Sequence, residues 1–208
     1  MKQKQNTRKM VLIAVFAAIE LLLAFTPLGF IPVGVTRATT VHIPVIIGGI
    51  VLGPAAGAIL GGVFGITSII INTFSPTVTS FVFSPFYSIG EYSGNMYSLI
   101  IALVPRILIG IVSAYTFQAI AKKDKTKLAA YSIAGLLGSL TNTILVMGGI
   151  YLFFGQSYAA AKEIGYETLF RFIMGVVAVN GIPEAIVAAL ITVAIGKVIR
   201  PVFHQYSN

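Results

Sequence analysis

Cysteine is absent from this 208-residue sequence, and its absence excludes disulfide bonds, thiolate metal ligands and thiol catalysis. The two histidines, His42 and His204, lie far apart along the chain, so we expect no histidine-based metal centre. Tryptophan is also absent, which disfavours ligands that need extensive stacking on large aromatic side chains. The sequence therefore predicts neither a metal site nor a reactive thiol.

Charged residues are scarce. They make up 10% of the sequence, and hydrophobic residues make up 57%. A soluble domain has about 25% charged and about 45–50% apolar residues, so this composition indicates a protein that crosses a membrane several times. The net charge of +8 does not indicate nucleic-acid binding, because that function needs a basic face on a soluble fold.

Motifs for catalysis and nucleotide binding are missing as well. The sequence has no phosphate-binding loop, since its one Gly-Lys pair, Gly196-Lys197, is followed by Val198. It has no metalloprotease motif and no nucleophile elbow, and it shows no selectivity filter or clear inverted repeat of broken helices. We therefore expect a protein that is not an enzyme, has no cofactor and does not itself bind ATP. A partner would supply the energy for any uphill transport.

Six hydrophobic segments predict an all-α integral membrane protein with six transmembrane helices in one bundle and one domain, residues 1–208. The segments are residues 10–27, 41–53, 54–74, 95–121, 128–154 and 169–199. The first is too long for the apolar part of a signal peptide, so we expect it to be retained. The second is short and could instead be re-entrant, and the last is long enough to tilt or to contain a turn.

The basic residues predict the orientation of the bundle. Ten of the fourteen lie in residues 2–9, 122–127 and 197–200, where Asp124 is the one acid. These three clusters fall on the same side of a six-helix topology, so the positive-inside rule places both termini in the cytoplasm. The opposite side carries the longer connections, residues 28–40, 73–94 and 155–168, and we expect it to capture a molecule from outside.

Small residues at helical spacing predict close helix packing. Gly57, Gly61 and Gly65 form a ridge along the third segment, and Ala14 and Ala18 form a small pair in the first. Such motifs serve either packing within the bundle or docking of another membrane subunit, and we favour internal packing for each of them taken alone.

Polar residues inside apolar helices are costly and are therefore candidates for function. Glu20, Arg106 and Glu184 are charged residues within predicted helices, and Arg106 could pair with either glutamate or face an anionic ligand. Hydroxyl, amide and aromatic residues gather in the outer connections, as in a small-molecule pocket, although aromatic residues at a membrane surface can also form a belt. The candidate substrate-binding residues are Arg37, His42, Asn72, Ser84, Tyr87, Asn95, Arg106, Asn142 and Asn180.

Three motifs resemble a known family. Residues 52–57 (LGPAAG), residues 105–110 (PRILIG) and residues 14–18 (AVFAA) are similar to segments of the substrate-binding S components of energy-coupling factor (ECF) vitamin transporters. The resemblance covers nearly the whole chain and implies a prokaryotic plasma-membrane protein that captures a vitamin. It also implies that Ala14 and Ala18 dock against a transmembrane coupling subunit, which two cytoplasmic ATPases drive.

Within the family, residues 39–44 (TTVHIP) and 74–86 look most like the pantothenate-specific members. Pantothenate is a small anion with hydroxyl groups and an amide, which suits arginine, asparagine, histidine and hydroxyl partners. Two alternatives stay open: an S component for another vitamin (a hydroxymethylpyrimidine or pyridoxine type, folate or riboflavin), or a stand-alone secondary transporter that couples an ion through Glu20 and Glu184.

Overall fold

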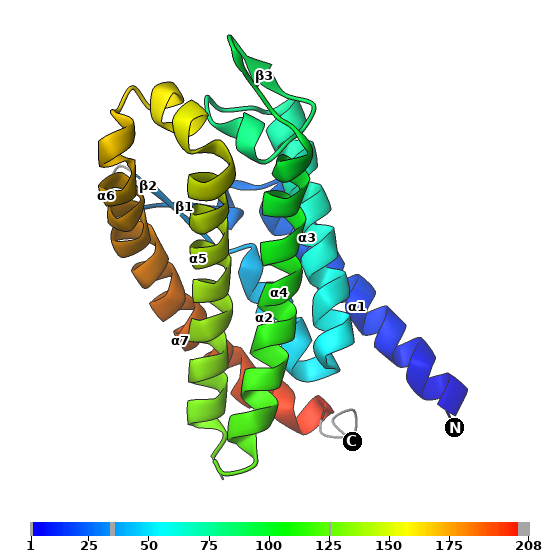
Figure 1. Cartoon of the computed structure of the whole chain (residues 1–208). Helices are drawn as coiled ribbons and strands as arrows, with labels where there is room; N and C mark the ends of the chain where they lie inside the picture. Colours follow the sequence, from blue (N-terminus) through cyan, green and yellow to red (C-terminus); the bar gives the residue numbers. More distant parts are fainter. Residues whose placement is uncertain (1, 34–35, 125, 204–208) are drawn as a thin grey trace.

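The computed structural model describes residues 2–33, 36–124 and 126–203, with side chains described within residues 6–29, 39–124 and 126–198. Helices make up most of the chain, and the long ones run alongside one another as a bundle (Figure 1). Among the described residues, four helical segments are long and apolar enough to cross a membrane: Pro54–Phe74, Met96–Ala121, Leu128–Ala161 and Tyr166–Val198. The chain is therefore an all-α integral membrane protein, as the sequence predicts.

A glycine–proline turn separates helix α2 (His42–Leu52) from helix α3 (Pro54–Phe74). Gly53 has a φ of 92°, in the region that favours glycine, and no atom lies within 4 Å of the position that its Cβ would take. Pro54 opens α3, where its missing N–H costs nothing because the first helical N–H groups have no partner within the helix. This turn reverses the chain without a longer loop.

The glycine ridge of α3 packs inside the bundle. A Cβ atom on Gly57 would lie 2.9 Å from the Cα of Gly110, and one on Gly61 would lie 2.6 Å from the Cα of Ile107. Both neighbours belong to helix α4 (Met96–Ala121), so the two backbones touch where no side chain fits. Internal packing is thus confirmed for this ridge, and it brings α4 close to α3 over several turns.

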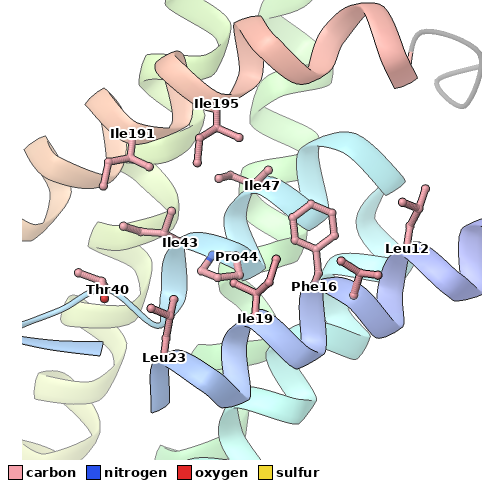
Figure 2. Close-up of a pocket in the computed structure, with 11 residues that line it drawn as sticks. Leu12, Phe16, Ile19, Leu23, Thr40, Ile43, Pro44, Ile47, Ile191 and Ile195 are labelled. Carbon is pink, nitrogen blue, oxygen red and sulfur yellow. The ribbon is translucent and has the colours of Figure 1, made fainter. Parts of the chain in front are cut away.

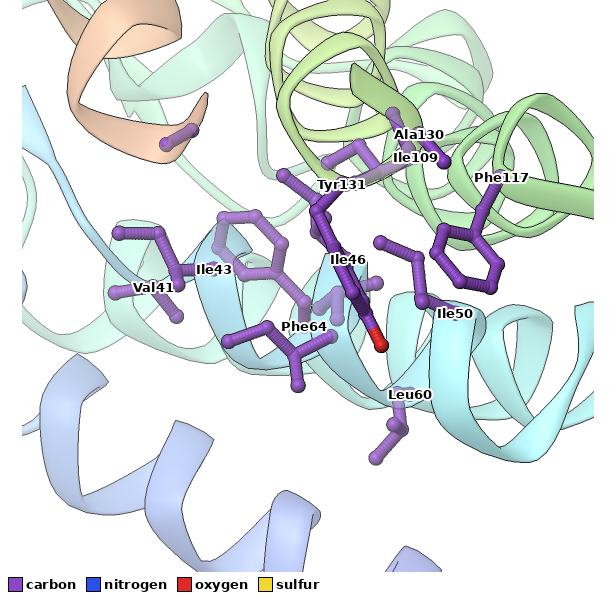
Figure 3. Close-up of a cluster of buried hydrophobic side chains, with 14 of the residues drawn as sticks. Val41, Ile43, Ile46, Ile50, Leu60, Phe64, Ile109, Phe117, Ala130 and Tyr131 are labelled. Atoms are coloured by element: carbon purple, nitrogen blue, oxygen red, sulfur yellow. The ribbon is translucent and has the colours of Figure 1, made fainter. Parts of the chain in front are cut away.

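Helix α2 lies in the centre of the bundle, and its residues are almost all buried. Figure 3 shows Ile46 and Ile50 of α2 near Ile109 and Phe117 of α4, with Tyr131 of helix α5 (Leu128–Ala161) beside them. The rings of Phe117 and Tyr131 have their centroids 4.6 Å apart. Because α2 has 11 residues, it is about 16 Å long, about half the thickness of the hydrocarbon core of a bilayer.

Helix α1 (Lys2–Ala24) lies at the side of the bundle and points away from it at its N-terminal end (Figure 1). The N-terminal end of α1, the C-terminal end of helix α7 (Ile182–Phe203) and the connection between α4 and α5 all lie at one end of the bundle (Figure 1). The three basic clusters are therefore on one side, as the sequence predicts. That this side faces the cytoplasm stays a prediction.

The last membrane segment is not a uniform α-helix. Helix α6 (Tyr166–Val176) passes into a π-helical stretch, η3 (Val177–Gly181), which continues directly into α7. Short elements connect the helices: the 3-10 turns η1 (Pro27–Gly29) and η2 (Ser80–Val82), the hairpin of β1 (Phe30–Val33) and β2 (Thr36–Thr39), and the small hairpin of β3 (Ser88–Ile89) and β4 (Tyr92–Ser93). Phe30 pairs with Thr39 in the first hairpin, and Ser88 pairs with Ser93 in the second.

Two of the predicted connections differ from the structure. Residues 155–161, expected as a loop, continue helix α5 to Ala161, because no proline interrupts them and Tyr158 and Ala159 are buried against the bundle. Residues 28–40, also expected as a loop, contain the β1–β2 hairpin. That residues 1–208 form a single domain stays a prediction.

Candidate functional site

A cavity of about 250 Å³ lies where α1, β2, α3, α4 and α5 meet. Its wall combines apolar side chains with hydroxyl groups, two amides and one guanidinium. The lining residues are Ala24, Thr39, Val41, Phe64, Thr67, Ser68, Ile71, Asn72, Phe83, Arg106 and Asn142. Three of the predicted substrate-binding residues, Asn72, Arg106 and Asn142, therefore meet at one cavity although they belong to three different helices.

Arg106 is the charged group of this cavity, and only 7% of its surface is exposed. Its guanidinium carbon lies 5.5 Å from the ring centroid of Phe64 and 5.3 Å from that of Phe83, so two aromatic faces stabilise the cation. Its Nη1 donates to the carbonyl oxygen of Ile101, whereas its Nε is buried without a hydrogen-bond partner. The protein thus satisfies Nη1, whereas the hydrogen-bonding capacity of Nε is unused within the described residues.

Arg106 is not paired with Glu20, which was one of the alternatives left open by the sequence. Both carboxylate oxygens of Glu20 are buried on α1 without a hydrogen-bond partner. Glu184 does have a partner, because its Oε1 accepts the backbone N–H of Thr39 at 2.7 Å. Within the described part of the chain, Arg106 thus has no carboxylate bonded to it, and a buried cation of this kind favours an anionic ligand.

Asn72 lines the cavity and also fixes the loop above it. Its Nδ2 donates to the carbonyl oxygen of Ser68 at 2.8 Å, and its Oδ1 accepts from the hydroxyl of Ser80 at 2.7 Å. The Ser80 oxygen in turn accepts the backbone N–H of Thr77 at 2.9 Å. Asn142 differs, because its Oδ1 is buried without a partner. The amide of Asn142 is therefore the one that has hydrogen-bonding capacity left for a ligand.

Four other predicted residues do not line this cavity. Ser84 is buried. Its hydroxyl oxygen lies 2.6 Å from the hydroxyl oxygen of Thr73 and accepts the backbone N–H of Phe86. Asn95 caps helix α4 and accepts the Tyr97 N–H at 2.8 Å, while the Ser98 hydroxyl accepts the N–H of Asn95. These contacts hold the chain in its turns. Of the other two residues, Tyr87 packs against a cluster of buried apolar side chains that includes Phe81 and Phe154. His42 is the first residue of α2 and is buried.

Three predictions concern residues at the edges of this region. Asn180 lies in the π-helical stretch, and its Oδ1 is buried without a partner, but it does not line the cavity. The side chain of Arg37 lies outside the described residues. Ala14 and Ala18 are both exposed on α1, so neither is used for packing inside the chain.

The sequence reasoning missed several wall residues of the cavity. Phe64, Thr67 and Ser68 precede Asn72 on α3 at spacings of four to eight residues, which places them on one helix face. The helical period counted back from Asn72 could have found them. Phe83 belongs to the loop before α4, and nothing local in the sequence places its ring beside Arg106.

A second hollow lies between α1, α2 and α7, with a volume of about 450 Å³ (Figure 2). Figure 2 shows Phe16 and Ile19 of α1 facing Ile43 and Ile47 of α2, with Ile191 of α7 beyond. Its wall is apolar apart from Thr40, whose hydroxyl donates to the carbonyl oxygen of Leu28 at 2.8 Å. Because this groove offers no charged group, the cavity around Arg106 is the better site for a polar ligand.

An apolar helical bundle that encloses a small polar cavity with a buried cation defines a membrane protein that binds a small molecule. Residues 8–196 match the family described as "ECF transporter, substrate-specific component". The chain belongs to this family, and it is a multi-pass membrane protein of a transport system.

Two relatives have a named substrate. The chain is 38% identical, over 161 residues, to a protein of Lactococcus lactis subsp. cremoris (strain MG1363) named "Pantothenic acid transporter PanT", with 76% of each chain covered. It is 28% identical, over 209 residues, to a protein of Leuconostoc mesenteroides subsp. mesenteroides named "Pantothenate transporter PanT". That second match covers 95% of this chain and 94% of the relative.

Proposed function

We propose that this chain captures pantothenate in the cavity around Arg106 and delivers it through an ECF transporter. The observation that carries the proposal is the buried guanidinium of Arg106, which lines the cavity and has neither a carboxylate partner nor a hydrogen bond at Nε within the described residues. Leaving a cation buried in this way is costly, and the carboxylate of an anionic ligand offsets that cost. The names of the two relatives support the choice of pantothenate.

The chemistry of the wall suits each part of pantothenate. The carboxylate would accept hydrogen bonds from the Nε edge of Arg106, since Nη1 is already held by Ile101. Asn142 and the hydroxyl groups of Thr67 and Ser68 would bond the hydroxyl and amide groups of the ligand. The rings of Phe64 and Phe83 would exclude water from the charged pair, and apolar lining residues would cover the hydrocarbon part.

The chain would act without catalysis and without binding ATP. A transmembrane coupling subunit and two cytoplasmic ATPases would supply the energy. Ala14 and Ala18 support docking of that subunit through α1, because they are exposed and their small size lets another helix approach closely. The chain itself would then provide only recognition of the vitamin.

Calorimetric titration of the purified chain with pantothenate and with panthenol tests the proposal. Panthenol carries an alcohol in place of the carboxylate, so the two ligands differ at the group that Arg106 would bind. We expect pantothenate to bind at least about 30-fold more tightly, because a buried charge pair that loses one partner costs about 2–5 kcal/mol. Binding of another vitamin without any binding of pantothenate would overturn the substrate assignment.

A further inference from the structure

The β1–β2 hairpin forms part of the wall of the cavity. Thr39, its last residue, lines the cavity together with Val41, which follows the hairpin. The two strands pair with each other over four residue pairs, from Phe30 with Thr39 to Val33 with Thr36. A two-stranded hairpin is marginally stable by itself. The position of Thr39 therefore depends on what ties the hairpin to the helices.

One such contact links the hairpin to α7, which is distant from it in the sequence. The backbone N–H of Thr39 donates to Oε1 of Glu184 at 2.7 Å. On the other side of the strand, the N–H of Thr40 donates to the carbonyl oxygen of Gly29 at 3.0 Å. Successive N–H groups of a strand point in opposite directions, so the N–H of Thr39 points away from β1 and is available to Glu184.

Glu184 lies in the first turn of α7, shortly after an irregular stretch of the chain. It follows the π-helical stretch and Pro183 directly, and only 9% of its surface is exposed. A Cβ atom on Gly181 would lie 2.6 Å from Cγ2 of Thr143, so this part of the segment touches α5 next to Asn142. A π-helical turn is rare in proteins and is frequently found at a functional site.

We propose that Glu184 is a positioning residue of the ligand site, which holds Thr39 against the cavity and thereby slows release of the bound vitamin. Glu184 does not line the cavity, so it acts through the hairpin and not by touching the ligand. The inference rests on the proposed function, because it takes the cavity around Arg106 as the pantothenate site.

The test measures the dissociation rate of radiolabelled pantothenate from the purified full chain. Glu184→Ala removes the acceptor, Thr39→Pro removes the N–H donor, and Glu184→Gln keeps an oxygen that can accept the same hydrogen bond. We expect Glu184→Ala and Thr39→Pro each to speed release about fivefold or more. The double variant should be no faster than either single one, and Glu184→Gln should stay within about twofold of the wild type. Glu167→Ala removes an exposed acid of α6 and is the matched control.

The outcomes separate this inference from the function on which it rests. If wild-type protein binds pantothenate and Glu184→Ala releases it at the wild-type rate, the positioning role is wrong. Additive effects of Thr39→Pro and Glu184→Ala would also contradict it, because the two changes would then act separately. If Thr39→Pro does not fold, the comparison of Glu184→Ala with Glu184→Gln decides, and equal release rates in these two variants would contradict the positioning role. Absence of pantothenate binding by the wild type would instead refute the proposed function.

Discussion

Replacing Arg106 by methionine removes the guanidinium while keeping an unbranched side chain between Phe64 and Phe83. Removing one partner of a buried charge pair costs about 2–5 kcal/mol, so we expect the affinity for pantothenate to fall at least about 30-fold. Panthenol lacks the carboxylate, and its affinity should change much less. The preference for pantothenate over panthenol should therefore disappear in Arg106→Met, and titration calorimetry measures both ligands directly.

The same variant makes a prediction about stability. Arg106 forms no ion pair within the described residues, and a buried charge without such a partner is destabilising because its desolvation is not compensated. We expect the ligand-free Arg106→Met protein to unfold at a temperature no lower than the wild type does. Arg106→Lys should bind pantothenate with intermediate affinity, because an ammonium keeps the charge but loses the planar fork. Wild-type affinity in Arg106→Met, or an equal loss for both ligands, would refute the reasoning.

Three further predictions concern packing, capping and docking. Gly61→Ala should lower stability by about 1–3 kcal/mol in thermal unfolding, because its Cβ would meet the α4 backbone. Gly62→Ala is the control, since nothing lies within 4 Å of its Cβ position, and equal losses in both would contradict this packing. Asn95→Ala should cost about 1 kcal/mol of stability and leave pantothenate affinity unchanged in calorimetry; a large loss of affinity would make Asn95 a ligand contact. Joint replacement of Ala14 and Ala18 by leucine should abolish uptake in cells and spare binding by the purified chain, whereas lost binding would show that they pack internally.

The helices could be predicted largely from the sequence because hydrophobicity and helix-breaking residues agree with each other. The predicted third segment, residues 54–74, coincides with α3 because Gly53-Pro54 opens it and Ser75-Pro76 follows it. The end of α5 was missed because residues 155–161 are less apolar, although no residue among them breaks a helix. Hydropathy marks where a chain meets lipid, and a helix can continue beyond that point.

The residues that line the cavity were predicted only in part. Arg106, Asn72 and Asn142 stand out in the sequence because polar groups within apolar helices are costly, and all three meet at the cavity. Ser84 and Asn95 are also polar, but their hydrogen bonds are made within the chain. Residue type shows that a group can bind a ligand, whereas only the fold shows whether a protein partner already occupies it.

The most direct test of the account is a structure of the chain with bound pantothenate. We predict that a carboxylate oxygen of the ligand lies about 2.9 Å from Nε of Arg106, with the hydrocarbon part against apolar lining residues such as Val41 and Ile71. The amide of Asn142 should face the hydroxyl or amide groups of the ligand. A carboxylate bound away from Arg106, or a vitamin seated in the apolar groove between α1 and α7, would contradict the central claim.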